Sequence, residues 1–160
     1  MALTFQIVGH KKSGKTTLIK DFLTMTDYKF SVVKHTHLPI DIPNTTDTGK
    51  FFEHSDDVLL LNNEQTIHYE RNPPTTELDK IKLIQQSTSA SFIIIEGIKE
   101  LDFPKLVLLK PDEAKTEFAN ITNIKEFISI QGNKQSIDIE DKDTRKQFIN
   151  NFLKDIKNDR

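Results

Sequence analysis

The stretch Gly9-His10-Lys11-Lys12-Ser13-Gly14-Lys15-Thr16-Thr17 matches the phosphate-binding pattern G-x-x-x-x-G-K-[ST]. Two glycines permit the tight backbone curvature that turns successive N–H groups toward an anion. Lys15 supplies a positive charge for the β- and γ-phosphates, and the hydroxyl of Thr16 is a suitable ligand for Mg²⁺. The residues expected to bind a nucleotide are Gly9, Lys11, Lys12, Ser13, Gly14, Lys15, Thr16 and Thr17.

The segments on both sides of this loop support the same interpretation. Residues 3–8 are mostly apolar and predict a strand, and residues 17–24 predict a helix with Leu18 and Phe22 on one face. Such a helix directs its positive N-terminal end at the phosphates. A glycine-containing turn that matches the pattern by chance is the alternative, and the flanking strand and helix disfavour it.

A second candidate ligand, Glu96, ends the most apolar strand of the chain, predicted over residues 91–97. A carboxylate at that position is placed to hold Mg²⁺ beside nucleotide phosphates, as in other phosphate-loop proteins. Gly97 would keep the following backbone slim near the phosphates. The alternative is an ordinary glutamate at a strand end that faces solvent.

The other periodic segments define the fold class. Further strands are predicted at 29–34, 58–61, 65–71 and 105–109 and within 121–130. Helices are predicted at 48–54, with Thr48 as the N-cap, from 75 or 76 to 87, and at 141–156. Apolar strands that alternate with helices predict an α/β fold of the P-loop NTPase type. We expect three layers, with a mostly parallel sheet, helices on both faces and a β-hairpin extension, in a single nucleotide-binding domain over residues 1–160. The site then belongs at the carboxyl ends of the strands.

The long polar segment 35–48 follows the second predicted strand, where nucleotide-dependent switch loops commonly lie. Asp41 and Asp47 are candidate catalytic residues, because a carboxylate there could sense the γ-phosphate, bind Mg²⁺ or orient water. The alternative is a set of solvated loop residues in which one aspartate caps a helix. His35, His37 and His54 have a spacing that fits no usual zinc site.

One further motif concerns the base of the nucleotide. Lys110-Pro111-Asp112 follows a late strand and has the K-x-D core of a guanine-reading motif, in which the aspartate accepts hydrogen bonds from the base. Leu109 occupies the position where an asparagine or threonine is expected. A strand followed by a turn explains the same residues, so both interpretations stay open.

Composition and charge restrict the class of partner. The 160 residues contain 22 basic and 24 acidic side chains, for a net charge of −2, so no electrostatic footprint for nucleic acid or an anionic membrane is expected. The absence of cysteine excludes disulfides and thiolate metal ligands. Without a signal-peptide pattern or a long apolar run, we expect a soluble cytoplasmic protein.

Taken together, these motifs resemble the molybdopterin-guanine dinucleotide biosynthesis protein B (MobB) family. The resemblance covers the N-terminal two-thirds and is carried by the loop 9–17, Val33-Lys34-His35 with Asp41, Pro43 and Asp47-Thr48 after it, and Glu96-Gly97-Ile98-Lys99 followed by Pro104-Lys105. Departures from the family pattern lie at Thr45-Thr46 and Ser55-Asp56-Asp57. The resemblance implies a homodimer that binds GTP with Mg²⁺ and hydrolyses it slowly at most. It also implies a partner, the molybdenum cofactor guanylyltransferase, which attaches GMP to molybdopterin.

Two other functions use the same loop. One is a small-molecule kinase that uses ATP, and the other is a P-loop adaptor of a different pathway. Such kinases usually need arginines in a lid, whereas Arg71, Arg145 and Arg160 are scattered along this chain. Weak hydrolysis is expected because no glutamine or arginine stands in a recognisable finger position. The hairpin around Asn62-Asn63 is the candidate dimer element, since exposed strand edges invite pairing.

Overall fold

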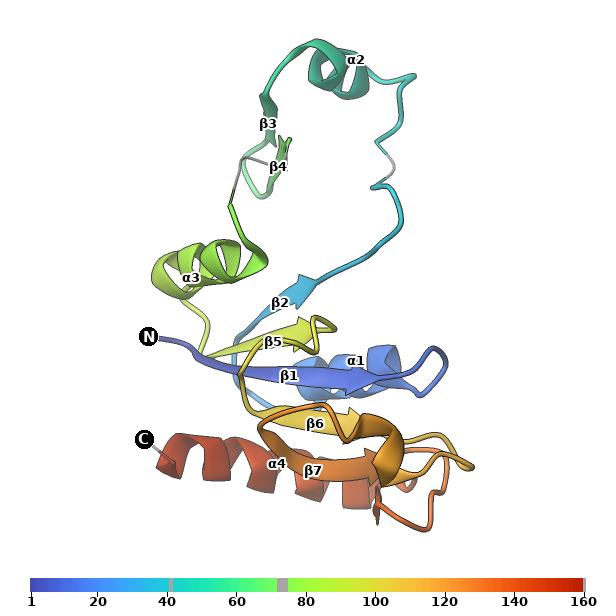
Figure 1. Ribbon diagram of the computed structural model, residues 1–160. Coiled ribbons are helices and arrows are strands. Elements are labelled where there is room, and N and C mark those ends of the chain that lie inside the picture. Colours follow the sequence, from blue (N-terminus) through green and yellow to red (C-terminus); the bar gives the residue numbers. More distant parts are fainter. Residues whose placement is uncertain (41, 72–74, 160) are drawn as a thin grey trace. The chain divides into compact units, whose positions relative to one another are not determined.

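Six parallel strands form the main sheet of the computed structural model, which describes residues 1–40, 42–71 and 75–159. The strands are β1 (Leu3–Gly9), β2 (Phe30–Lys34), β5 (Phe92–Glu96), β6 (Lys105–Leu108), β7 (Ile124–Ser129) and β8 (Ile137–Asp138). Their order is β2-β5-β1-β6-β7-β8, and each neighbouring pair is parallel (Figure 1). β1 therefore lies inside the sheet, and the phosphate loop leaves its carboxyl end between the ends of β5 and β6.

Two helices, α1 (Lys15–Met25) and α4 (Lys142–Asn158), cover one face of this sheet. Phe5 of β1 points to that face, where its ring lies 5.2 Å from Phe22 of α1 and 5.1 Å from Phe152 of α4, between centroids. These rings belong to the largest buried cluster of the chain. The helical spacing of Leu18 and Phe22 thus produces the contact that fixes α1, and with it the end of the phosphate loop.

The opposite face is covered by α3 (Glu77–Ser87) and by the 3₁₀ helix η1 (Lys115–Phe118). Ile81 of α3 packs on Ile93 and Ile95, and Phe118 of η1 packs near Val107. Alternate residues of β5 therefore enter different clusters, as a strand buried on both faces requires. The expected α/β architecture with helices on both faces is confirmed.

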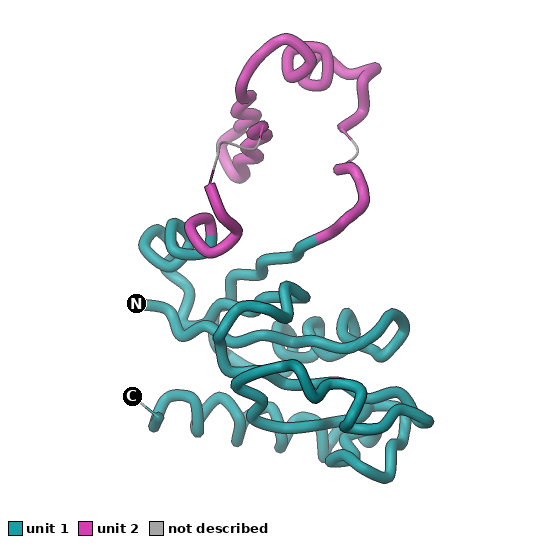
Figure 2. The backbone as a smooth tube through the Cα atoms, viewed as in Figure 1, with its two compact units in different colours: residues 1–35, 81–160 teal, residues 36–80 magenta. Residues whose placement is uncertain are grey.

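The chain divides into two compact units, drawn in Figure 2: residues 1–35 with 81–160, and residues 36–80. The second unit, called the inserted unit below, holds α2 (Asp47–His54) and the antiparallel hairpin of β3 (Asp57–Leu61) and β4 (Thr66–Glu70). Within it, the Arg71 guanidinium lies over the Phe52 ring, 4.7 Å from the centroid, and donates hydrogen bonds to Phe52 O and Ser55 O. The expected hairpin extension is present here.

Some boundaries differ from expectation for identifiable reasons. α1 begins at Lys15, two residues early, because Gly14 is itself its N-cap. The cap of α2 is Thr46 and not Thr48, since the Thr46 hydroxyl accepts a 3.1 Å hydrogen bond from Gly49 N. The predicted strand within 121–130 is β7, and the short β8 beyond it was not expected. None of the helices in the described part of the chain has the length and apolar character needed to cross a bilayer.

Candidate functional site

The phosphate loop is a tight turn whose shape depends on glycine at position 14. Gly14 has φ of 97°, a left-handed value that residues with a side chain rarely adopt. A Cβ atom on Gly14 would lie 2.2 Å from Cδ1 of Ile130, which follows β7. The first turn of α1 then presents backbone N–H groups that have no partner within the helix, as an anion site requires.

Lys15 folds back over this loop. Its Nζ donates hydrogen bonds of 2.8 Å to Gly9 O and 2.8 Å to His10 O. Partial burial lowers the pKa of the Lys15 ammonium from its ordinary value, the Glu96 carboxylate opposes this change, and the charge on Lys34 adds to it. The Lys15 ammonium therefore lies against two carbonyl oxygens of the loop. Phosphate oxygens could replace these two carbonyls as its hydrogen-bond acceptors.

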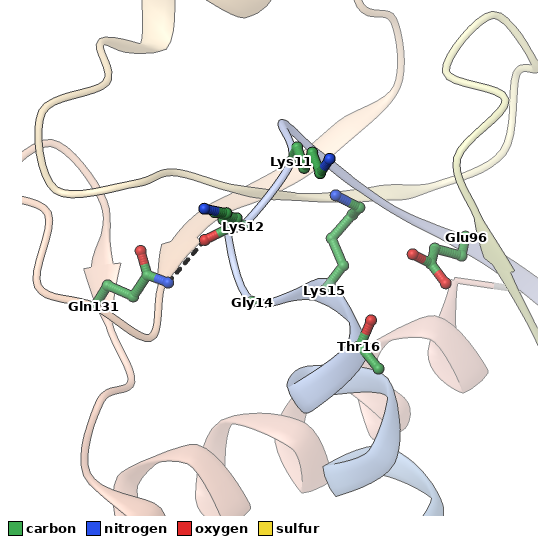
Figure 3. A pocket seen from close by; sticks show the side chains of 7 residues that line it. All are labelled: Lys11, Lys12, Gly14, Lys15, Thr16, Glu96 and Gln131. Atoms are coloured by element: carbon green, nitrogen blue, oxygen red, sulfur yellow. Dashed lines mark hydrogen bonds between the residues drawn. The ribbon is translucent and has the colours of Figure 1, made fainter. Parts of the chain in front are cut away.

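A cleft of about 360 Å³ lies beside the loop, a size within the range of ligand pockets. Figure 3 shows the side chains around it, with the Glu96 carboxylate directed toward Lys15 and Thr16. Three lysines and one carboxylate give the cleft a net positive lining. Its lining residues are Lys11, Lys12, Gly14, Lys15, Thr16, Glu96 and Gln131.

Glu96 occupies the carboxyl end of β5, where it is paired in register with Ile7 of β1 and Lys34 of β2. Its side chain is 15% exposed, and one carboxylate oxygen lies 3.4 Å from Lys34 Nζ. A hydroxyl on Thr16 and a carboxylate on Glu96 are hard oxygen donors at the same cleft, which is the donor chemistry that Mg²⁺ prefers. These two residues fit the magnesium role.

A hydrogen-bonded cluster supports the loop from the side of β6. His10 Nδ1 lies 2.7 Å from Glu113 Oε1, Lys110 Nζ lies 3.1 Å from the same oxygen, and Lys110 N donates to Glu113 Oε2. Asn133 Nδ2 donates to the carbonyl oxygens of Lys110 and Glu113. His10, Glu113 and Glu117 are close enough to share a metal ion, but the ammonium of Lys110 already neutralises the buried carboxylate.

The loop after Glu96 is held by two buried polar side chains. Gln6 Nε2 donates to Gly97 O at 2.9 Å and to Ile98 O at 2.7 Å. Lys105 Nζ donates to Leu101 O and Phe103 O, and burial lowers the pKa of this ammonium, while Asp102 acts in the opposite direction. Lys105 therefore stabilises the loop that begins beside the cleft.

Comparison with known proteins places this architecture in a family. The family model described as "Molybdopterin guanine dinucleotide synthesis protein B" matches residues 4–133. The chain belongs to the MobB family. A Methanocaldococcus jannaschii protein, provisionally named a molybdopterin-guanine dinucleotide biosynthesis adapter protein, is 33% identical over 110 residues, which are 65% of this chain and 46% of that protein.

Two other proteins extend the comparison. The molybdopterin-guanine dinucleotide biosynthesis adapter protein of Haemophilus influenzae is 28% identical over 114 residues, 68% of this chain and 64% of the relative. The chain thus matches about half to two-thirds of the length of these curated relatives. The crystal structure of a MobB homolog from Bacillus stearothermophilus has a TM-score of 0.72 at 19% identity, covering 97% of this chain and 98% of the other, and so shares the fold.

The MobB fold gathers some of the predicted residues and separates others. Gly9 and Ser13 support the loop from behind the cleft: Gly9 O accepts from Lys15, and the Ser13 side chain is fully buried. Thr17 is exposed on the first turn of α1. Asp47 is exposed in the inserted unit, 3.8 Å from Lys50 Nζ, and Asp41 lies outside the described residues.

Other residues at the site of this MobB chain belong to no recognisable sequence motif. Gln131 donates through Nε2 to Lys12 O and so joins the β7 end to the loop. Glu113 reaches His10 across 103 positions of sequence. In the sequence, Lys34 was singled out only as part of the family resemblance, and no role was expected for it. Asp112 is exposed in the turn after β6, next to Glu113, whose carboxylate accepts a hydrogen bond from Lys110 N.

Proposed function

We propose that this chain is an adapter of molybdopterin-guanine dinucleotide biosynthesis that binds GTP and Mg²⁺ at the phosphate loop. The role of adapter is taken from the names of its relatives. The observation that carries the nucleotide part is the cleft at the carboxyl ends of β1 and β5, which is lined by Lys15, Thr16 and Glu96.

Each residue has a defined task in this proposal. Lys15 exchanges its two loop carbonyls for the β- and γ-phosphate oxygens, and the backbone of residues 12–17 donates hydrogen bonds to the same groups. Thr16 and Glu96 would hold Mg²⁺, which neutralises phosphate charge when bound. Asp47 or Asp41 senses the γ-phosphate.

Hydrolysis is slow in this proposal. Gln131 is a glutamine at the cleft, but its amide nitrogen donates a hydrogen bond to Lys12 O. Of the arginines that the structure describes, Arg71 is stacked on Phe52, and Arg145 is buried against Asp21. Neither arginine is among the residues that line the cleft, and an arginine finger that stabilises a transferring phosphoryl group supplies a large rate factor. The same observation disfavours a small-molecule kinase.

The partners follow from the proposed pathway and from the hairpin. We propose that the chain works as a homodimer with the guanylyltransferase that attaches GMP to molybdopterin. An isolated two-stranded hairpin is marginal in water, and β3 exposes three consecutive leucines, Leu59, Leu60 and Leu61. A second copy of the chain that covers these side chains would supply the missing packing.

Thermal unfolding with Mg²⁺ and GTP, ATP or no nucleotide tests the choice of nucleotide. Ligand at roughly 100 times its dissociation constant adds about 2.7 kcal/mol, or roughly 5–11 °C for a domain of this size. We expect that shift with GTP. An equal or larger shift with ATP would instead favour a kinase or an ATP-dependent adaptor. Co-purification with the guanylyltransferase, but not with unrelated nucleotidyltransferases, tests the pathway.

A further inference from the structure

We infer that Lys34 is a ligand of the terminal phosphate and makes the site select a nucleoside triphosphate over a diphosphate. This inference rests on the proposed nucleotide site. It assigns a task to a residue whose Nζ lies 3.4 Å from the carboxylate of Glu96, one of the residues that line the cleft.

Lys34 is the last residue of β2, and it is in register with Glu96 at the carboxyl end of the adjacent strand β5. The charge on Lys34 also acts on the ammonium of Lys15. Glu96 therefore lies between two lysines, one from the phosphate loop and one from β2. A second cation, from β2, thus lies beside the Glu96 carboxylate that lines the cleft.

The ion pair between Lys34 and Glu96 is easily exchanged. A separation of 3.4 Å is longer than the 2.7–2.9 Å of a strong charge-assisted hydrogen bond, and the Lys34 side chain is 62% exposed. Exposed ion pairs of this kind contribute little free energy. The ammonium can move on its flexible stem without breaking any buried contact. Glu96, which is only 15% exposed, keeps its place as Lys34 moves.

Lys34 and Mg²⁺ would compete for the Glu96 carboxylate. If Mg²⁺ takes the carboxylate, Lys34 loses its partner while remaining beside the phosphates. The nearest new anion would then be the γ-phosphate, which Lys34 would share with Lys15, while the loop backbone donates hydrogen bonds to the inner phosphates. A diphosphate offers no such group. Lys34 would therefore strengthen binding of the triphosphate selectively.

The position of Lys34 also has a consequence for signalling. The next residue, His35, donates its N–H to Glu96 O at 3.3 Å, and the chain then enters the inserted unit at Thr36. Two contacts at the end of β2, one from Lys34 and one from His35, are thus made with Glu96. A lysine that binds the γ-phosphate at this point would change its contacts with the number of phosphates. The chain segment that enters the inserted unit begins two residues later.

Titration calorimetry of GTP and GDP, each with Mg²⁺, tests the assignment on the wild type, Lys34→Ala and Lys34→Arg. Lys29→Ala is the matched control, because Lys29 is an exposed lysine just before the other end of β2. We expect Lys34→Ala to weaken GTP about 10-fold, which is 1.4 kcal/mol, with GDP changed less than about 2-fold. Lys34→Arg and Lys29→Ala should retain the wild-type ratio of the two affinities.

Two results would overturn the assignment, and they are distinguishable. An unchanged ratio of GTP to GDP affinity in Lys34→Ala, or an equal loss for both nucleotides, would show that Lys34 does not read the terminal phosphate, while leaving the nucleotide site intact. A wild-type protein that binds neither nucleotide would overturn the proposed function itself, and the role of Lys34 with it.

Discussion

Single residues far apart in the sequence hold the phosphate loop in shape. Gln131 binds the carbonyl of Lys12, Ile130 fills the space beside Gly14, and Glu113 binds His10. None of these contacts belongs to a local motif. The loop sequence itself predicts where phosphates bind, but its supports come from the ends of β6 and β7, which only the folded sheet brings near.

Glu113→Gln should flatten the dependence of stability on acid pH. Burial acts to raise the pKa of Glu113, but hydrogen bonds from Lys110 and His10 outweigh it, so the folded-state pKa lies below the ordinary 4.5. The ionised carboxylate therefore stabilises the fold above about pH 4.5, and this contribution is lost as the pH falls through the folded-state value.

Urea unfolding of the wild type and Glu113→Gln between pH 7 and pH 3 measures this difference. We expect the two free energies of unfolding to converge as the pH falls. Glu100→Gln, a change at an exposed glutamate, should behave like the wild type. A gap between wild type and Glu113→Gln that stays constant from pH 7 to pH 3 would show that the carboxylate has no such role.

Residues with local motifs could be singled out from the sequence. The cleft brings together Lys11, Lys12, Gly14, Lys15 and Thr16 from the loop with Glu96 from β5, two segments that the sequence marked separately, and their binding of a nucleotide and Mg²⁺ stays a prediction. Sequence reasoning failed to single out Gln131, because an amide on a loop after a strand has no distinguishing pattern. The role of Asp47 stays a prediction, since that residue lies in the inserted unit.

At the scale of elements, α4 and α1 are joined by a buried ion pair as well as by aromatic packing. Arg145 of α4 donates to Asp21 of α1 at 2.5 Å, and its other guanidinium nitrogens donate to Ile139 O and Glu140 O. These bonds fix the start of α4 beneath the sheet. The periodicity of α4 was visible in sequence, but this use of Arg145 was not, because an arginine in an amphipathic helix normally faces solvent.

Arg145→Met should destabilise the protein by about 3–5 kcal/mol, because Asp21 and two carbonyl oxygens would lose their donors in a site that excludes most water. Denaturant unfolding measures the effect, with Lys146→Met as the control at the neighbouring exposed position. A loss below about 1 kcal/mol would mean that water replaces the guanidinium at little cost. The secondary structure of both variants should match the wild type by circular dichroism.

Elements with weak periodicity were the hardest to predict. β8 has two residues, too few for an alternating pattern, and it follows the loop that carries Gln131. The N-cap of α2 was predicted two residues too late. Residues 45–48 include three candidate caps, Thr45, Thr46 and Thr48. The turn at Pro43 selects Thr46, whose hydroxyl donates to Pro43 O. Local chemistry left the choice open, and the neighbouring backbone decided it.

For the whole molecule, the division into two units suggests a division of tasks. Residues 1–35 and 81–160 contain the complete cleft, and residues 36–80 carry exposed apolar side chains on a hairpin. Leu60 and Ile67 are directly opposite each other on β3 and β4, 46% and 48% exposed. Such a pair is suited to an interface between two copies of the chain.

The double variant Leu60→Ser/Ile67→Ser should shift the protein from dimer to monomer in sedimentation equilibrium, because it removes the apolar area that the second copy would cover. Leu83→Ser is the matched control, an exposed leucine on α3 outside the inserted unit, and it should leave the dimer unchanged. If the wild type sediments as a monomer at high micromolar concentration, the hairpin has another occupant.

The most direct measurement is titration calorimetry of GTP, with and without Mg²⁺, on the wild type, Lys15→Ala and Lys20→Ala. We predict one Mg²⁺-dependent site on the wild type and on Lys20→Ala, whose exposed lysine lies further along α1. Lys15→Ala should bind roughly 10- to 150-fold more weakly, the range for a hydrogen bond to a charged group. Equal affinity for GTP in Lys15→Ala and the wild type, or no binding by the wild type, would contradict the assignment of this cleft to nucleotide phosphates.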